Sequence, residues 1–299
     1  MNKKKELTEK HFGSLWFLPG DNYGRYPFCH SIYIEGPGIL IDPASNRERL
    51  IEIKKHYGVS EVWLSHSHED HFMHLDLFDG LPLSTSELEA KVLSNMDLFM
   101  DAYEIPPGEY QYWQPLFEEQ FHFKPREVSK FLKGGQVIST GAVTIEIINA
   151  PGHTPGHTAF FFHEPSVLFL GDYDLTRFGP WYGDKFSSLE DTVASVEALK
   201  KIQAKVWMTG HETGIFEEEP GELWDEYLNV IWRREERILE LLSEPRSLQD
   251  LMSFWIIYGK PKEPRIFFEL GERLHIGKHL ERLLRLGMVT LDNGKYIRV

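Results

Sequence analysis

The sequence is poor in cysteine: Cys29 is alone among 299 residues, and a single thiol excludes an intramolecular disulfide framework. Because Cys29 lies in an apolar, aromatic stretch, we interpret it as a small buried side chain rather than a reactive thiol. No apolar run reaches the roughly 18 residues of a membrane-spanning helix, and residues 1–7 lack the apolar segment of a signal peptide. These absences predict a cytoplasmic protein without a membrane span.

Basic charge is also scarce in the sequence. Lys and Arg number 32 against 46 Asp and Glu, which gives a net charge of −14 and disfavours non-specific binding to nucleic acid or to an anionic membrane. A hydrophobic content of 41% with 26% charged residues is typical of a folded globular chain. The length predicts one large domain, or one domain with a small appendage.

Short apolar runs in the first two thirds of the chain predict β-strands. They cover residues 31–34, 38–41, 61–65, 143–148, 167–170 and 206–208. Most of these runs end just before a side chain that can bind a metal ion. Because rigid strands position loop residues at one edge of a layered α/β fold, this recurrence predicts a site at that edge.

Helices are predicted between these strands. Ser86 with Glu89 fits a capping box that opens a helix over residues 84–102. Its apolar residues recur every four positions, at Leu88, Val92, Met96 and Met100. Ser187 with Glu190 caps a second helix. Residues 105–123 are interpreted as an irregular, aromatic-rich segment that packs in the core. Two alternative roles for this segment are to cover the site or to form an oligomer contact.

The last quarter of the chain differs in character. A charged helix from about residue 225 to Leu242, a helix opening at Ser247, an apolar helix face at residues 276–284 and a hairpin over residues 288–299 resemble a winged-helix module. We therefore predict two domains, residues 1–225 and residues 226–299. The second domain has 13 basic residues against 11 acidic ones, a small excess for phosphate binding.

A nucleic-acid-binding protein is the rival function for that module. Its candidate recognition helix carries Lys278, His279, Arg282 and Arg285. Given the small charge excess, we favour a role in packing or in a homodimer.

The densest group of chemically competent residues is His66-Ser67-His68-Glu69-Asp70-His71, directly after a predicted strand. In a tight loop, His66 and His68 can face one cation while Asp70 and His71 face a second. Imidazole nitrogens and carboxylate oxygens are the ligands that zinc and similar divalent ions take. The segment therefore predicts a metal site.

These residues match the H-x-H-x-D-H signature of the metallo-β-lactamase superfamily, which the sequence resembles from residue 42 to residue 211. Four further features occur in the family's order: Asp42 at the end of an early strand, His153 in Pro-Gly-His-Thr-Pro-Gly-His, Asp172 in Leu-Gly-Asp, and His211 in Thr-Gly-His. The resemblance implies an αββα sandwich, with the winged-helix-like module appended at the C-terminus.

The resemblance also implies the ligand sets. His66, His68 and His153 would hold a first metal ion, Asp70, His71 and His211 a second, and Asp172 would bridge the two. Two divalent cations, with zinc the first choice and manganese or iron as alternatives, would lower the pKa of a bridging water so that hydroxide acts as the nucleophile. Asp70 and Asp172 are the predicted catalytic carboxylates.

Other residues are given supporting roles. Asp42 is predicted to orient a ligand histidine, and His157 resembles a histidine of the family that supports the site without binding metal. Candidates for lining a substrate pocket are Arg177, Trp181, Tyr182 and His74. His74 lies where the family usually has small glycine residues, so this sequence departs there from the best-known members.

The predicted function is hydrolysis of an ester, thioester or lactone of a small molecule. A phosphodiesterase such as an endoribonuclease of the same fold is the second choice. A mononuclear iron persulfide dioxygenase is the third, because some such members keep the same histidines. His68 occupies a position where oxygen-reducing members have glutamate, which favours hydrolysis over redox chemistry.

Overall fold

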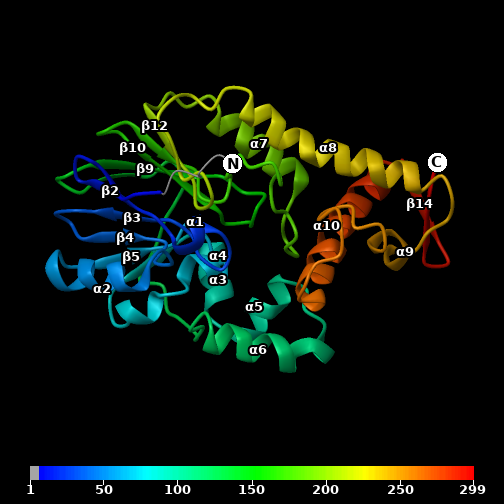
Figure 1. The fold of residues 1–299 in the computed structure, drawn as a ribbon, viewed down its shortest axis with the longest axis horizontal. Coiled ribbons are helices and arrows are strands. Elements are labelled where there is room, and N and C mark those ends of the chain that lie inside the picture. The colour runs from blue at the N-terminus through cyan, green and yellow to red at the C-terminus, as the bar shows by residue number, and fades with distance from the viewer. Residues whose placement is uncertain (1–6) are drawn as a thin grey trace, which may run out of the picture.

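The computed structural model describes residues 7–299, and two β-sheets that pack face to face form its centre, with helices on both outer sides (Figure 1). The first sheet has the strand order β1-β2-β3-β4-β5-β6-β7. These strands are β1 (Lys10–Phe12), β2 (Leu15–Leu18), β3 (Ser31–Ile34), β4 (Ile39–Ile41), β5 (Glu61–Trp63), β6 (Leu83–Thr85) and β7 (Lys130–Phe131). Neighbours from β1 to β4 are antiparallel, and those from β4 to β7 are parallel.

The second sheet has the order β13-β12-β11-β10-β9-β8. Its strands are β8 (Val137–Ser139), β9 (Thr144–Asn149), β10 (Thr158–Phe162), β11 (Val167–Phe169), β12 (Val206–Met208) and β13 (Ile215–Phe216). Only the pair β11 and β12 is parallel in this sheet.

The strands are apolar on both faces because each sheet is covered on both sides. In β2, Leu15 and Phe17 point into the core between the sheets, whereas Trp16 and Leu18 point to the outer helices. Residues from β9 and β10, such as Ile145 and Phe160, complete the inner core. This arrangement of layers confirms the predicted αββα sandwich.

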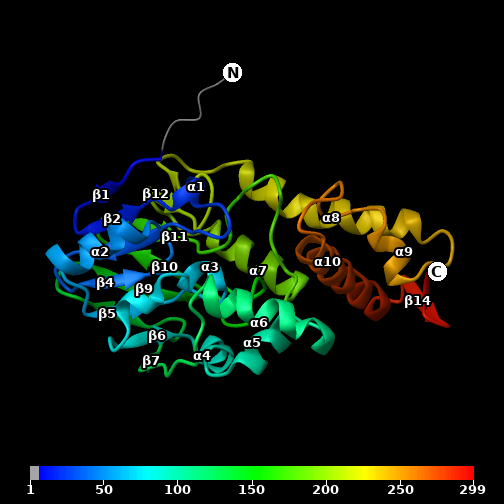
Figure 2. The same cartoon turned by 60° about the horizontal axis from the view of Figure 1, so that its bottom comes forward.

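The helices cover the two outer faces and extend the chain at its C-terminal end (Figures 1 and 2). Those within the sandwich are α1 (Asp21–Gly24), α2 (Arg47–His56), α3 (Glu69–Phe72), α4 (Glu87–Leu93), α5 (Met96–Ala102), α6 (Tyr110–Glu119) and α7 (Leu189–Leu199). Single 3₁₀ turns lie at Leu75–Phe78 and Pro107–Glu109. Among residues 7–299, no helix combines the length and the apolar character that crossing a membrane requires.

The single helix predicted over residues 84–102 is wrong. The structure has α4 and α5 there, separated at Ser94 and Asn95. The side chain of Asn95 accepts hydrogen bonds from the backbone N–H groups of Asp97 and Leu98 and so opens a new helix. Leu88 lies on α4, which buries Glu89 and Leu93 instead, and its side chain is 54% exposed.

The segment 105–123 is also more regular than predicted. Residues 110–119 form α6, and its residues Trp113 and Phe117, one turn apart, are buried in the core beneath the first sheet. Pro115 lies inside this helix, and an internal proline is a sequence signal against a helix. For the helix after residue 187, Ser188 rather than Ser187 provides the cap, by accepting from the N–H of Asp191.

The C-terminal quarter contains α8 (Leu223–Leu241), α9 (Leu248–Met252), α10 (Arg265–Arg285) and the hairpin of β14 (Val289–Asp292) and β15 (Lys295–Arg298). Helix α8 joins two cores: Trp224 and Ile231 pack on the second sheet, whereas Ile238 packs on α10 and the hairpin. The predicted boundary at residue 225 falls within α8. The division into two domains and the winged-helix assignment remain predictions.

The candidate recognition residues on α10 are engaged within the chain. Lys278 is buried and donates to the carbonyl of Lys185 at 2.7 Å, and His279 is fully buried. Arg282 and Arg285 both pair with Glu190 at the start of α7. Lys278, His279 and Arg282 on this face of α10 therefore pack within the chain, whereas Arg285 stays exposed.

Candidate metal centre

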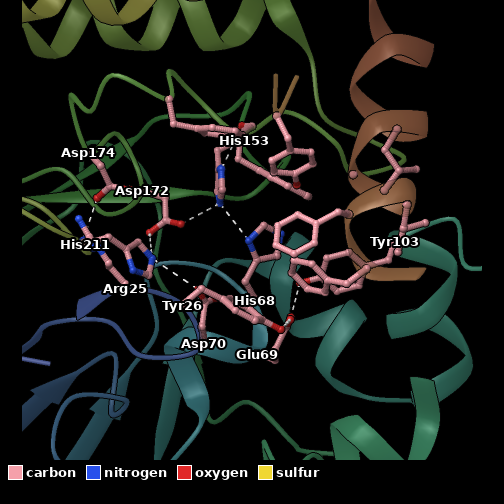
Figure 3. A pocket seen from close by; sticks show the side chains of 18 of the residues that line it. Arg25, Tyr26, His68, Glu69, Asp70, Tyr103, His153, Asp172, Asp174 and His211 are labelled. Atoms are coloured by element: carbon pink, nitrogen blue, oxygen red, sulfur yellow. Dashed lines mark hydrogen bonds and ion pairs between the residues drawn. The ribbon is translucent and has the colours of Figure 1, made fainter. Parts of the chain in front are cut away.

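All seven predicted metal ligands lie on loops or at a helix start that follow strands, and Figure 3 shows five of them together: His68, Asp70, His153, Asp172 and His211. The loop after β5 carries His66 and His68 and leads into α3, whose first turn presents Asp70 and His71. His153 lies between β9 and β10, Asp172 follows β11 and His211 follows β12. The strand ends therefore bring together residues from 66 to 211 of the sequence, as the site prediction requires.

His66, His68, His153 and Asp172 form one group, whose ligand atoms all lie within 4.8 Å of one another. Nε2 of His153 is 3.1 Å from Nε2 of His66 and 3.0 Å from Nδ1 of His68. Oδ2 of Asp172 is 3.4 Å from the same His153 nitrogen.

Asp70, His71 and His211 form a second group within the same limit. Nε2 of His71 is 3.2 Å from Nε2 of His211, which is 3.6 Å from Oδ2 of Asp70. Asp172 turns its other oxygen to this group, with Oδ1 2.7 Å from Nε2 of His71. One carboxylate thus lies between the two groups.

In the neutral form of each ring, the nitrogen that faces these groups carries the lone pair, because the opposite nitrogen is used in a hydrogen bond. Nδ1 of His153 donates to the carbonyl of Trp181, and Nδ1 of His211 lies 2.6 Å from the carbonyl of Gly24. Nδ1 of His71 bonds Asp42, and Nε2 of His68 bonds Asp184. Lone pairs about 3 Å apart repel unless a cation lies between them, and tetrahedral zinc sites with Zn–N of about 2.0–2.1 Å hold nitrogens at about 3.3 Å.

The electrostatics of the site favour bound positive charge. Burial lowers the pKa of His66 and His153 well below the usual range, which keeps both rings neutral and suited to ligation. Burial also acts on His71 and His211, but there the Asp172 carboxylate outweighs it and raises both pKa values well above the usual range. Divalent metal ions fit this donor set and its charge.

Asp42 lies where it can orient a ligand. Its Oδ2 is 3.0 Å from Nδ1 of His71 and accepts from the hydroxyl of Ser65, while its Oδ1 accepts from the backbone N–H of Ser65. His157 uses both ring nitrogens away from the two groups: Nδ1 bonds the carbonyl of Ala150, and Nε2 accepts the backbone N–H of Asp172. These contacts support the roles that were predicted for Asp42 and His157.

Three acidic residues near the groups were not found by sequence reasoning. Asp184 is buried, and its Oδ2 lies 2.8 Å from Nε2 of His68. Asp174 accepts the backbone N–H of His211, and burial raises its pKa to about 7. Glu89 was predicted only as part of a helix cap. A signal existed for Asp174 alone, because it stands two residues after Asp172 in the same loop.

Glu89 holds the two histidine loops together. It is 1% exposed. Its Oε2 accepts from the backbone N–H and the hydroxyl of Ser67, and its Oε1 accepts from the hydroxyl of Thr154 and the backbone N–H of Gly156. One carboxylate therefore fixes the loop of His66 and His68 against the loop of His153.

A cavity of about 540 Å³ opens beside the two groups. His68, Asp70, His153, Asp172 and His211 form its polar end. Its size lies within the range of small-molecule sites. The site can therefore present a substrate to the same residues that would hold the metal ions.

Of the four residues predicted to line a substrate pocket, the structure places only Trp181 on the cavity. Arg177 is exposed outside it. Tyr182 is fully buried and points away, toward His279 on α10. His74 is buried beside Arg47 and Asp76. These three residues therefore lie off the cavity, and their role in substrate binding stays a prediction.

The chain resembles known proteins in both sequence and fold. The family model of the metallo-beta-lactamase superfamily matches residues 24–211. A hydroxyacylglutathione hydrolase of Hyphomonas neptunium is 28% identical over 191 residues, which cover 62% of this chain and 59% of that relative. An atrochrysone carboxyl ACP thioesterase of Paecilomyces divaricatus is 24% identical over 242 residues, which cover 77% of this chain and 65% of that relative. The matches thus span less than two thirds of both relatives.

Solved structures share the fold over nearly the whole chain. A metallo-beta-lactamase family protein from Thermus thermophilus superposes with a TM-score of 0.70 at 23% identity, covering 96% of this chain and 99% of that one. A beta-lactamase domain protein from Burkholderia ambifaria superposes with a TM-score of 0.69 at 18% identity, covering 96% and 91%. The family model covers more than half of the chain and contains all seven candidate ligands, so this protein belongs to the metallo-beta-lactamase superfamily.

Proposed function

We propose that the chain is a hydrolase that binds two divalent metal ions, with zinc the first choice, and cleaves an ester, thioester or lactone. The observation that carries this proposal is the donor set: seven buried or nearly buried side chains aim lone pairs and carboxylate oxygens into two adjoining groups, with Asp172 between them. Bound divalent cations would bring the pKa of a water close to neutrality and polarise a carbonyl oxygen.

The chain's own residues supply position and charge. His66, His68 and His153 would hold the first ion, and Asp70, His71 and His211 the second. Asp70 and Asp172, which line the cavity, are the proposed catalytic carboxylates. In the reaction, water adds to the acyl carbon, the carbon–oxygen or carbon–sulfur bond breaks, and a carboxylate leaves together with an alcohol or a thiol.

A thioester is the first substrate to test. The two relatives described above carry the names of a glutathione-derivative hydrolase and a carrier-protein thioesterase, and the cavity beside the site accommodates a small-molecule acyl group. The purified protein is expected to hold about two equivalents of zinc, manganese or iron, and to hydrolyse a simple acyl thioester faster than bis(4-nitrophenyl) phosphate. Elemental analysis and parallel assays before and after chelation measure both.

His68→Ala and His163→Ala serve as a matched pair in this experiment, because His163 is an exposed histidine directly after β10. The metal content and the rate of thioester hydrolysis should both fall in His68→Ala and should both stay at the wild-type level in His163→Ala. Faster cleavage of the phosphodiester would replace the proposal with a phosphodiesterase. A single iron without hydrolysis would replace it with the dioxygenase.

A further inference from the structure

The cavity beside the metal centre has one polar end and a long apolar wall. The wall comes from α6 and α10, which approach each other from distant parts of the sequence (Figure 2). Its residues are Trp113 and Phe117 on α6 and Phe267, Phe268, Leu270 and Leu274 on α10. The polar lining comprises five candidate metal ligands together with Arg25, Asp174 and Glu212, and the ammonium group of Lys262 lies over the ring of Phe268 at 5.2 Å.

Two tyrosines hydrogen-bond a buried carboxylate that lies between the ligands and the wall. Glu69 lines the cavity, and its two oxygens accept hydrogen bonds from the hydroxyls of Tyr26, at 2.9 Å, and Tyr103 (Figure 3). The ring of Tyr26 in turn packs on Phe267 at 5.1 Å. The surface between the metal centre and α10 is thus aromatic, with the polar atoms of Glu69 already paired.

We propose that this wall binds the acyl part of the substrate, and that the acyl group is apolar and of medium length or longer. The inference rests on the proposed hydrolase function, because the reacting carbonyl would then lie at the polar end. Phe267 and Phe268 are only partly buried, so an apolar chain seated against them would remove further apolar surface from water. Each methylene that is buried should raise kcat/KM about three- to fourfold.

The test compares acetyl and octanoyl thioesters of N-acetylcysteamine. The wild type is expected to prefer the octanoyl substrate at least tenfold in kcat/KM. Leu270→Trp, which adds bulk to the wall at a half-buried position, should reduce that preference at least tenfold. Leu286→Trp, the same change at an exposed site past the end of α10, should retain the wild-type preference.

The octyl thioether of N-acetylcysteamine resembles the octanoyl thioester but has no carbonyl and cannot be hydrolysed. Its binding, measured by calorimetry, therefore tests this inference separately from the proposed hydrolase function. If the wild type binds the thioether and Leu270→Trp does not, while no thioester is hydrolysed, the wall binds apolar chains but the hydrolase proposal is wrong. If acetyl and octanoyl thioesters are hydrolysed equally, or if Leu270→Trp leaves the preference unchanged, the wall does not bind the acyl group.

A second, independent set of contacts concerns the loop of residues 178–187, which lies between Asp172 and α7. On the side of the metal centre, the carbonyl of Trp181 accepts from Nδ1 of His153 at 3.1 Å, and Asp184 holds Nε2 of His68 at 2.8 Å. Asp184 is itself tied to Trp181, whose indole N–H donates to it at 3.1 Å. This loop therefore orients two ligands of the first ion.

The opposite side of the same loop is held by α8 and α10. Arg234 donates to the hydroxyl of Tyr182 at 3.1 Å and to the carbonyl of Phe178 at 2.7 Å. That hydroxyl lies 2.9 Å from Nε2 of His279, whose Nδ1 faces Glu235. Tyr182, Arg234 and His279 are all buried, so these bonds are made away from water and fix the loop firmly.

We infer that the C-terminal helices position the first metal site through Tyr182. Ligand orientation by hydrogen-bonded partners commonly changes metal affinity by about 10- to 100-fold, and Tyr182 acts one step further out. Tyr182→Phe is therefore expected to weaken binding of the first zinc ion by about three- to tenfold, while the second ion binds as in the wild type. The inference rests on the proposed metal centre.

Titration of the metal-free protein with zinc against a fluorescent chelator gives both affinities without an activity assay. Tyr296→Phe is the matched control, because it removes a hydroxyl from the C-terminal hairpin. Asp184→Asn should weaken the same first site more strongly. Unchanged zinc affinities in Tyr182→Phe, or equal losses at both sites, would overturn the inference. If Tyr182→Phe does not fold, Lys278→Met, which removes the bond to the carbonyl of Lys185, takes its place under the same criteria.

Discussion

Asp172→Asn is expected to lower kcat/KM for a thioester at least about 10³-fold, which corresponds to about 4 kcal/mol of transition-state stabilisation, and to reduce the zinc content below one ion per chain. Asp172 turns one oxygen to each group of ligands, at 3.4 Å from His153 and 2.7 Å from His71. Asparagine has nearly the same shape, but it loses the negative charge and presents an N–H donor to one of the two groups. Both ions would then lose their shared anion.

Elemental analysis and steady-state kinetics of the same preparations measure the two expected losses. Asp292→Asn, the identical change at an exposed position in the C-terminal hairpin, should have neither effect. Full metal content with unchanged kinetics in Asp172→Asn would show that Asp172 does not bridge metal ions, and the ligand assignment would have to be revised.

The candidate ligands could be predicted because each is marked by local sequence. His66, His68, Asp70 and His71 stand within six residues, and Asp172 and His211 each follow an apolar run that is short enough to be a strand. Their grouping into two metal sites, in contrast, was implied by the resemblance to the metallo-β-lactamase superfamily, because the residues follow strands of two different sheets. The six predicted apolar runs match β3, β4, β5, β9, β11 and β12 to within about two residues, whereas the other strands of the two sheets were not predicted.

The residues that support the ligands could not be predicted in this way. Asp184 meets His68 from 116 residues away, and no motif surrounds it. The direction of Tyr182, into α8 and α10 rather than into the cavity, depends on a contact with His279 that only the folded chain makes. The cavity wall likewise joins α6 to α10, and both helices were incompletely predicted. Pro115 is a sequence signal against the helix α6. The periodic apolar residues from 276 to 284 identified only the second half of α10.

Glu89 shows how a local signal can conceal a long-range role. As a capping-box residue it would be worth about 1 kcal/mol, but its side chain leaves the cap and accepts four hydrogen bonds from the two histidine loops. Glu89→Ala would leave these buried donors without partners. We expect a loss of about 3–5 kcal/mol in the free energy of unfolding, because unpaired buried groups cost far more than a net hydrogen bond contributes.

The chain offers graded controls for this prediction. Glu89→Gln keeps one acceptor oxygen and should lose roughly half as much. Glu87→Ala, an exposed glutamate in the first turn of the same helix, should change the free energy of unfolding by less than about 0.5 kcal/mol. Urea unfolding of the metal-free proteins measures the series. Equal stability of Glu89→Ala and Glu87→Ala would mean that the histidine loops keep their conformation without this carboxylate. The expected order, in contrast, would make Glu89 the residue that fixes His66 and His68 against His153 before any metal ion binds.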